Sequence, residues 1–309
     1  MELTTEMPDT DERERRSRLW DDLLARGGPH GIEPNILRAL RLYGGAQGIW
    51  VDKTTTVGEQ SPHGIAVSVL HTGRSYADDL TADGVVYHYP TTNRPSTRDA
   101  AEVEALKGAC LQRLPIFVIT TGTPARLRNI KRGFVVDFDD QSRQCLILFG
   151  DALPQNSAAD DGAFTLRQPR GRRNSAGSRP SRSASFQFGV LKRYGARCAV
   201  CGISIAAVID AAHLCPVDEE GSDDPRNGLP LCATHHRAFD ARLFGLEPGE
   251  LRIVSAEGGP SLYDLRITHS DLTHLDALPH PEAVRWRWKH KWLRTGIPPV
   301  SDLIDADGR

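Results

Sequence analysis

The segments CAVCGISIAAVIDAAHLCP, residues 198–216, and LCATHHRAFD, residues 231–240, decide the fold of the C-terminal part of the chain. Each segment contains two metal-ligand residues separated by two positions: Cys198 and Cys201, then Cys232 and His235. Three thiolates and one imidazole fill a tetrahedral zinc site completely, and such a site is structural because no position remains for a substrate. We therefore predict a structural zinc ion here, rather than four unrelated side chains of a reduced protein.

A short strand is expected between the two ligand pairs. Residues 208–216 are rich in β-branched and small side chains and end at a proline. Because side chains alternate along a strand, Asp210 and His213 are expected on opposite faces. A single histidine in an apolar run is more often a core residue. Within this set of ligands we interpret His213 as chemically active, since a neutral imidazole accepts a proton from water near pH 7.

A helix is expected to follow the second ligand pair. Asn227-Gly228 indicates a turn, and the helix then runs from near Cys232 through Phe239. His236 and Asp240 are four positions apart and share one face of that helix. The strand, the turn and the helix would together surround one zinc ion.

This pattern resembles the HNH nucleases of the ββα-metal class, and in particular the McrA-like branch, whose sequences contain the motifs AAH, NGL and LCxxHHxxFD. The resemblance covers residues 190–294 and implies a metal-dependent endonuclease that hydrolyses DNA phosphodiesters. It also implies that His213 is the general base, that Asn227 braces the loop, and that His236 is a ligand of the catalytic metal.

The second ligand of the catalytic metal is less clear from the pattern. Ala212 precedes the base, where the family often has a metal-binding Asp or His. Asp210, on the strand, or Asp240, on the helix, is expected to replace that ligand. Because Mg²⁺ prefers oxygen ligands and water, a site of one histidine and one carboxylate is expected to use Mg²⁺ or equally Mn²⁺, Co²⁺ or Ni²⁺.

Six short β-rich runs predict an N-terminal β domain. They are bounded by Gly, Pro, Asp and Ser and lie at residues 48–52, 64–70, 84–89, 115–120, 133–138 and 145–149. One helix, expected over residues 99–112, interrupts the series. Six such runs with one packed helix favour a curved or barrel-like β domain.

Residues 63–89 resemble the SRA (SET and RING-associated) domain. Its signature is an apolar strand, GGYxDD, a D-x-G motif and an aromatic strand that ends in tyrosine; here Arg74-Ser75 replaces the glycine pair. The resemblance extends over residues 40–150 and implies a PUA-like curved β-barrel that flips a modified cytosine out of DNA. Tyr76 and Tyr89 would stack against the base, and Asp79 would accept a hydrogen bond from its exocyclic amine. The alternative is that the tyrosines belong to the core and the acids to loop caps.

Composition limits the class of protein. The chain has 309 residues, 39% of them hydrophobic, and a formal net charge of −2, which suits about two domains. No apolar run approaches the roughly 18 residues of a membrane span, and the charged residues 1–22 contain no secretory signal. Six cysteines, three of them in the predicted zinc site, fit a reducing compartment. We expect a cytoplasmic protein without a membrane partner.

The predicted fold class is α+β, in four segments. A charged helical segment at 1–30 precedes the SRA-like reader at 31–152; an Arg/Ser/Gly-rich flexible linker follows at 153–186, then the zinc-stapled HNH domain at 187–309. The linker has no acidic residue after Asp161. Its arginines either contact DNA phosphates or belong to a solvated tether.

These segments together predict a type IV modification-dependent restriction endonuclease. Its substrate would be double-stranded DNA carrying 5-methylcytosine or 5-hydroxymethylcytosine, and a homodimer is expected at least on DNA, because one centre cuts one strand. Two alternatives remain. The N-terminal domain of an HNH nuclease could read another modification or plain sequence, or the protein could bind modified DNA without cutting it.

Overall fold

The computed structural model divides the chain into two compact units. The first unit contains residues 1–157 with 183–185, and the second contains residues 158–182 with 186–309. The structure describes residues 9–44, 48–59, 61–71, 80–90, 96–154, 162–168 and 183–292. Most of the predicted linker lies outside the described residues, including Arg170, Arg172, Arg173, Arg179 and Arg182. In the described part of the chain, no helix is both long and apolar enough to cross a membrane.

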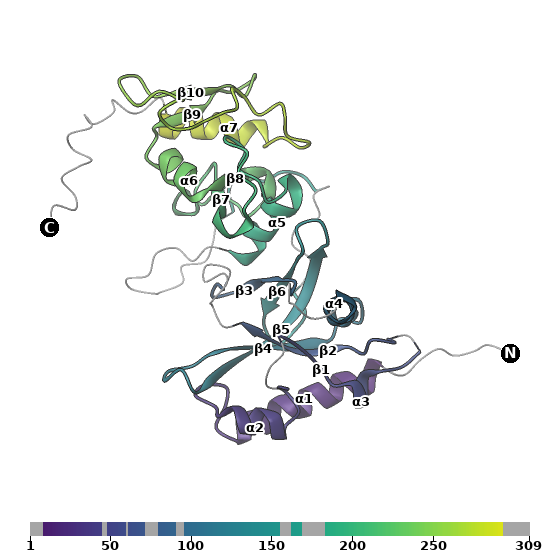
Figure 1. Ribbon diagram of the computed structural model, residues 1–309. Helices are drawn as coiled ribbons and strands as arrows, with labels where there is room; N and C mark the ends of the chain where they lie inside the picture. The colour runs from purple at the N-terminus through teal and green to yellow at the C-terminus, as the bar shows by residue number, and fades with distance from the viewer. Residues whose placement is uncertain are drawn as a thin grey trace. The chain divides into compact units, whose positions relative to one another are not determined.

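The first unit is built on one six-stranded sheet with the strand order β1-β2-β4-β5-β6-β3 (Figure 1). The strands are β1 (Ile49–Val51), β2 (Ala66–His71), β3 (Gly84–His88), β4 (Pro115–Thr121), β5 (Arg128–Asp139) and β6 (Gln144–Phe149). Neighbouring strands are antiparallel, except that β2 and β4 are parallel. All six predicted β-rich runs are therefore strands.

The expected barrel closure is not found. Among the described residues, β1 and β3 are the two edges of the sheet and do not pair with each other. Closure would need a continuous ladder between these edges, but β1 has only three residues and its register shifts between Trp50 and Val51. The β-rich runs identify the strands, but they carry no information on whether the edges meet.

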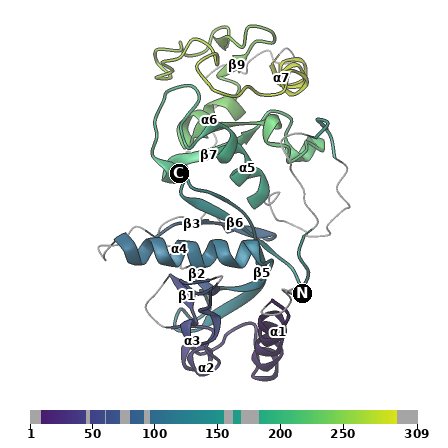
Figure 2. The same cartoon turned by 90° about the vertical axis from the view of Figure 1, so that its right-hand side faces the viewer.

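Helices cover both faces of this sheet. They are α1 (Asp9–Ala25), α2 (Pro34–Ala39), the short α3 (Lys53–Thr56) and α4 (Ser96–Leu111). Figure 2 shows α4 lying along the sheet. In β4, Ile116 and Val118 belong to the core that includes Leu106 of α4, whereas Phe117 and Ile119 belong to the core that includes Leu23 of α1. Because β4 is buried on both faces, its sequence is continuously apolar instead of alternating.

Helix α1 is docked on the first unit by a buried charge as well as by apolar contacts. The guanidinium of Arg16 is fully buried. Its Nε donates to Glu12 Oε1 at 2.7 Å, and its Nη1 donates to the carbonyl of Pro115, at the start of β4, at 2.7 Å. Trp20 stacks on Phe117 with 5.9 Å between the ring centroids. The charged N-terminal helix is thus part of the first unit's core structure.

Among its described residues, the second unit contains two small antiparallel sheets and three α-helices, the first of which begins two residues before Phe186, where the longer segment of the unit starts. Its elements are α5 (Ala184–Tyr194), β7 (Ile209–His213), β8 (Gly228–Cys232), α6 (Ala233–Asp240), β9 (Phe244–Leu246), β10 (Ile253–Ser255) and α7 (Pro281–Arg287), which continues as a π-helical turn over Trp288–Trp292. β7 pairs with β8, β9 pairs with β10, and α6 contacts both β7 and β8. The order β7-β8-α6 gives the ββα arrangement that the resemblance implied.

Strand β8, whose sequence GLPLC contains a proline, was not among the predicted strands. The carbonyl of Pro230 accepts a hydrogen bond from the backbone N–H of Ala199 at 2.8 Å. In an antiparallel strand the N–H and C=O of one residue point to the same side. The backbone of Pro230 therefore faces the Cys198–Cys201 turn and not β7, so the missing N–H removes no ladder bond.

Candidate metal and nuclease centre

Four potential metal ligands converge beside β8 and α6. The side chains of Cys198, Cys201, Cys232 and His235 each offer a ligand atom, and these atoms lie within 4.8 Å of one another. Nδ1 of His235 is 3.1 Å from Sγ of Cys232 and 3.7 Å from Sγ of Cys198. A tetrahedral zinc ion with bonds of about 2.0–2.3 Å separates its ligands by about 3.5–3.8 Å. The predicted cluster therefore has the donor set and the size to hold zinc.

Local backbone structure explains how the cluster forms. Gly202 closes the first turn with a φ of +73°, and its N–H donates to the carbonyl of Cys198 at 2.9 Å; a positive φ favours glycine. Cys232 is the N-cap of α6, so His235 lies in the first turn of that helix. Nε2 of His235 is 2.8 Å from the carbonyl of Leu265, which leaves Nδ1 directed at the thiols.

The cysteine thiols of the cluster also differ in pKa. Burial raises the pKa of Cys201 to about 12. At Cys198 burial also raises the pKa, but a hydrogen bond from His235 and backbone N–H groups outweigh it and lower the pKa to about 6. One thiolate is thus stabilised by the protein itself, and a bound divalent cation would supply the charge that the other thiolates need.

His213 ends β7 and has fixed neighbours. Its ring stacks on Phe186 of α5, with 3.5 Å between the centroids and an interplanar angle of 11°. Its Nε2 lies 3.5 Å from Oδ1 of Asp223. Gly228 pairs with His213, and a Cβ at Gly228 would lie 2.5 Å from the Phe186 ring, so the glycine of the NGL motif leaves room for the stacked pair.

Asn227 is fully buried and spans the loop between β7 and β8. Its Oδ1 accepts from the N–H of Cys215 at 2.9 Å, and its Nδ2 donates to the carbonyls of Cys215 at 3.0 Å and Ser222 at 2.9 Å. All these partners are backbone groups of the loop. This geometry is that of a brace, which is the role that the resemblance assigned to Asn227.

His236 lies on α6 between two carboxylates. Its Nδ1 is 3.0 Å from Oδ2 of Asp210 on β7, and its Nε2 is 3.5 Å from Oδ2 of Asp240. The two acids therefore contact opposite edges of the imidazole, and one cation bound to one ring nitrogen cannot take all three ligands in this arrangement. Asp240 is 62% exposed and also lies 3.5 Å from Nη2 of Arg287, so Asp210 is the better placed second ligand.

Arg287 is a residue of this centre that sequence reasoning missed. It comes from α7, is only 7% exposed and lies over the ring of Phe239 at 3.9 Å. Its Nη2 donates to the carbonyl of Phe239 at 2.7 Å, and its Nη1 is 3.5 Å from the carbonyl of His213. Burial lowers the pKa of Arg287 to about 10. Arg287 thereby connects α6 to β7.

The predicted base pocket is located only in part. Tyr76 and Asp79 lie outside the described residues. Tyr89 directly follows β3 and is 8% exposed; its hydroxyl donates to Oδ1 of Asp140 at 3.1 Å. Nζ of Lys107 on α4 is 2.8 Å from the other oxygen of Asp140. The structure therefore places Tyr89 in the core of the first unit.

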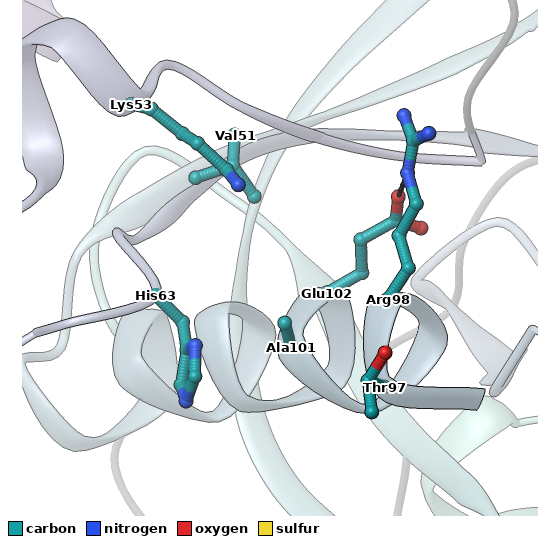
Figure 3. A pocket seen from close by; sticks show the side chains of 7 residues that line it. All are labelled: Val51, Lys53, His63, Thr97, Arg98, Ala101 and Glu102. Carbon is teal, nitrogen blue, oxygen red and sulfur yellow. Dashed lines mark ion pairs between the residues drawn. The ribbon is translucent and has the colours of Figure 1, made fainter. Parts of the chain in front are cut away.

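A separate cavity of about 380 Å³ lies in the first unit between β1, α3 and α4. It is lined by Val51, Lys53, His63, Thr97, Arg98, Ala101 and Glu102 (Figure 3). Nε of Arg98 is 3.6 Å from Oε1 of Glu102 within it. Tyr89 is not among the described residues that line this cavity. Its described lining is largely charged and contains no tyrosine, unlike the pocket that the sequence predicted.

Comparison with known proteins places the second unit in a class. Residues 198–247 match the family model described as HNH endonuclease, and this segment contains the zinc-type cluster, β7, β8 and α6. The protein thus carries an HNH endonuclease domain and is an HNH-type DNA nuclease.

The comparison over the whole chain supports no more than a distant similarity. A solved structure, "Modification dependent TagI restriction endonuclease", is similar at 20% sequence identity and a TM-score of 0.33, over 85% of this chain and 93% of that chain. No curated protein matches the chain.

Proposed function

We propose that this protein is a modification-dependent restriction endonuclease that cuts double-stranded DNA with its HNH domain. The observation that carries the nuclease half is the placement of His213 and of the Asp210–His236 pair on neighbouring elements of one ββα unit. The Cys₃His cluster and the buried amide of Asn227 hold these elements in place. A structural zinc ion would therefore act on the reaction only by fixing the scaffold.

His213 is the general base of the proposed reaction. It takes a proton from water, the water oxygen forms a bond to phosphorus, the bond from phosphorus to the leaving oxygen breaks, and that oxygen takes a proton from solvent. Asp210 and His236 would hold the catalytic cation, Mg²⁺ or alternatively Mn²⁺, Co²⁺ or Ni²⁺. When bound, the cation stabilises negative charge on the phosphate and on the leaving oxygen. Asp240 is the less favoured ligand.

The reader half of the proposal rests on the SRA-like motif of residues 63–89. Tyr76 and Tyr89 would stack on a flipped 5-methylcytosine or 5-hydroxymethylcytosine, and Asp79 would accept from its exocyclic amine. The burial of Tyr89 and its bond to Asp140 favour a second candidate, in which the first unit reads another modification or plain sequence. In either case one centre per chain cuts one strand, so we propose that two chains act together on DNA.

The test is cleavage of one plasmid prepared unmodified, with 5-methylcytosine and with 5-hydroxymethylcytosine, in Mg²⁺, Mn²⁺, Co²⁺ or Ni²⁺. The variant His213→Ala should lose cleavage by at least about 10²-fold, the usual contribution of a general base. His274→Ala, which removes an exposed histidine of the same unit, is the matched control.

The possible outcomes distinguish the nuclease half of the proposal from the reader half. Cutting that is confined to modified DNA and lost in His213→Ala supports both halves. Equal cutting of all three plasmids would retain the nuclease and reject the modified-cytosine reader. Tight binding to modified DNA without cutting in any of these metals would overturn the proposed reaction and favour a binding module.

A further inference from the structure

We infer that Asp223 is a positioning residue for His213: its carboxylate sets the tautomer and the orientation of the proposed general base. This inference rests on the proposed role of His213. Asp223 lies in the acidic loop between β7 and β8, which the sequence pattern did not connect with the reaction. Neither the HNH-type motifs nor the ligand spacing indicates it.

The geometry around His213 restricts the ring from two sides. Phe186 stacks on the imidazole at 3.5 Å between centroids, which fixes the plane of the ring. Within that plane, Nε2 faces Oδ1 of Asp223 at 3.5 Å, and both atoms are buried from solvent. Arg287 approaches the backbone of this residue: its Nη1 is 3.5 Å from the His213 carbonyl.

The loop holds Asp223 by anchoring the residues on both sides of it. Ser222 is buried, and its carbonyl accepts from Nδ2 of Asn227 at 2.9 Å. Asp224 caps the following 3₁₀ turn by accepting from the N–H of Arg226 at 2.9 Å, and it also pairs with the Arg226 side chain at 2.6 Å. Two adjacent acids therefore have different tasks: Asp224 stabilises the turn, and Asp223 faces the imidazole.

Through this arrangement the hydrogen bonds of Asn227 influence the chemistry of His213. A histidine whose Nε2–H donates to a carboxylate keeps the lone pair of Nδ1 available as the base. When Nδ1 takes the proton from water, the carboxylate stabilises the imidazolium and does not itself become protonated. The separation of 3.5 Å is longer than a good hydrogen bond, and such contacts commonly shorten when the substrate binds. Asn227 acts on the reaction through Ser222 and Asp223.

The experiment compares Asp223→Asn with the wild type in the full-length protein on the plasmid that the wild type cuts. Asparagine keeps the size of the side chain but removes its charge. We expect kcat to fall by about 10²–10⁴-fold with little change in KM, because the loss of a correctly oriented base affects the chemical step. Asp218→Asn, at an exposed acid of the same loop, should cut like the wild type.

The pH profile distinguishes positioning from a structural role. Without the neighbouring negative charge the imidazolium is less stable, so the acidic limb of the rate profile should move to lower pH in Asp223→Asn. Asp223→Glu, which restores the charge at a different reach, should recover part of the rate. Thermal unfolding of the three variants should show that the fold is retained.

Three results would overturn the inference. If saturating Mn²⁺ restores the rate of Asp223→Asn, the carboxylate is a metal ligand and not a partner of His213. If Asp223→Asn cuts like the wild type while His213→Ala is inactive, the inference fails and the proposed function stands. If His213→Ala itself cuts normally, the proposed base is wrong and the role of Asp223 falls with it.

Discussion

In the second unit the candidate catalytic groups lie on adjacent elements of one ββα unit, whereas in the first unit Tyr89, the predicted reader residue that the structure describes, is packed in the core. The second unit secures its geometry with short polar connections: a Cys₃His cluster, the buried amide of Asn227 and the guanidinium of Arg287. The first unit relies on apolar layers on both faces of a six-stranded sheet. Its one fully buried cation, among the described residues, is Arg16.

The two units should therefore lose their folded structure in different ways. The strands of the second unit are short, and two ligands of its cluster, Cys198 and Cys232, are buried in its apolar core, so the fold of this unit should depend on the cluster. A larger sheet with helices on both faces can lose one polar contact and remain folded.

The largest effect is expected from removal of the cluster's metal. Chelation of zinc, or Cys201→Ser, should unfold the second unit while the first retains its own unfolding transition. Apparent zinc-binding free energies at structural sites reach about 10–16 kcal/mol, which is comparable with the whole stability of a domain, about 5–15 kcal/mol. Calorimetry with metal analysis measures both quantities.

The matched control for the cluster is Cys110→Ser. Cys110 is a half-buried thiol of the first unit, as Cys201 is of the second, but it is not part of the cluster. The Cys110→Ser variant should leave the metal content and the unfolding temperature of the second unit unchanged. If chelation also leaves that unfolding temperature unchanged, the four side chains do not form a metal site and the contrast between the units is wrong.

A smaller effect is expected from Glu12→Gln in the first unit. Its carboxylate compensates the buried charge of Arg16 at 2.7 Å, and removal of one partner of a buried ion pair costs about 3–5 kcal/mol. The unfolding temperature of the first unit should fall, and the unfolding temperature of the second unit should stay the same. Glu14→Gln, at an exposed position of the same helix, is the control. A shift of both transitions would show that the units do not unfold separately.

The same pair predicts a pH dependence. Burial raises the pKa of Glu12, but its bonds to Arg15 and Arg16 outweigh burial and hold the pKa below its usual value of 4.5. A carboxyl group with a depressed folded-state pKa stabilises the fold fully above the unfolded-state pKa, and that stabilisation is lost as the pH falls through the folded-state pKa. The first unit should therefore lose stability in acid below pH 4.5, and Glu12→Gln should reduce that loss.

The sequence predicted the Cys₃His cluster and the ββα unit of the second unit because their geometry is local. The spacing within each ligand pair and the NGL motif determine which groups meet within a turn or across one strand pair. Asp223 and Arg287 escaped prediction for the opposite reason. Asp223 reaches His213 only because Asn227 folds the intervening loop, and Arg287 arrives from a distant helix; no spacing rule connects such residues.

In the first unit the sequence predicted the strands but not their closure. Apolar runs bounded by turn residues locate the strands, but pairing between the edges depends on strand length, register and curvature. The sequence is similarly limited in what it predicts about the reader residues. Tyr89 has an aromatic ring that could stack on a base, but in the structure it is a core residue that is hydrogen-bonded to Asp140. An aromatic side chain at a strand end is compatible with either role.

The smallest expected effect concerns Tyr89 and tests whether its ring reads a base. Tyr89→Phe removes the bond to Asp140 and should cost about 0.5–1.5 kcal/mol of stability, with unchanged preference for modified DNA. Tyr89→Leu keeps an apolar side chain but removes the π face. Stacking of a base on an aromatic ring contributes about 1–3 kcal/mol, so the ratio of affinities for modified and unmodified DNA should fall by about 5–150-fold.

Tyr87→Leu is the matched control, because Tyr87 is a buried tyrosine of β3 two residues earlier in the same core. Both leucine variants lose a core ring and should be destabilised alike, so a difference between them in the affinity ratio reports base stacking and not folding. If Tyr89→Leu keeps the full preference for modified DNA, Tyr89 is a core residue only. A reader in the first unit would then depend on other residues, and the charged cavity at Glu102 would become the next place to examine.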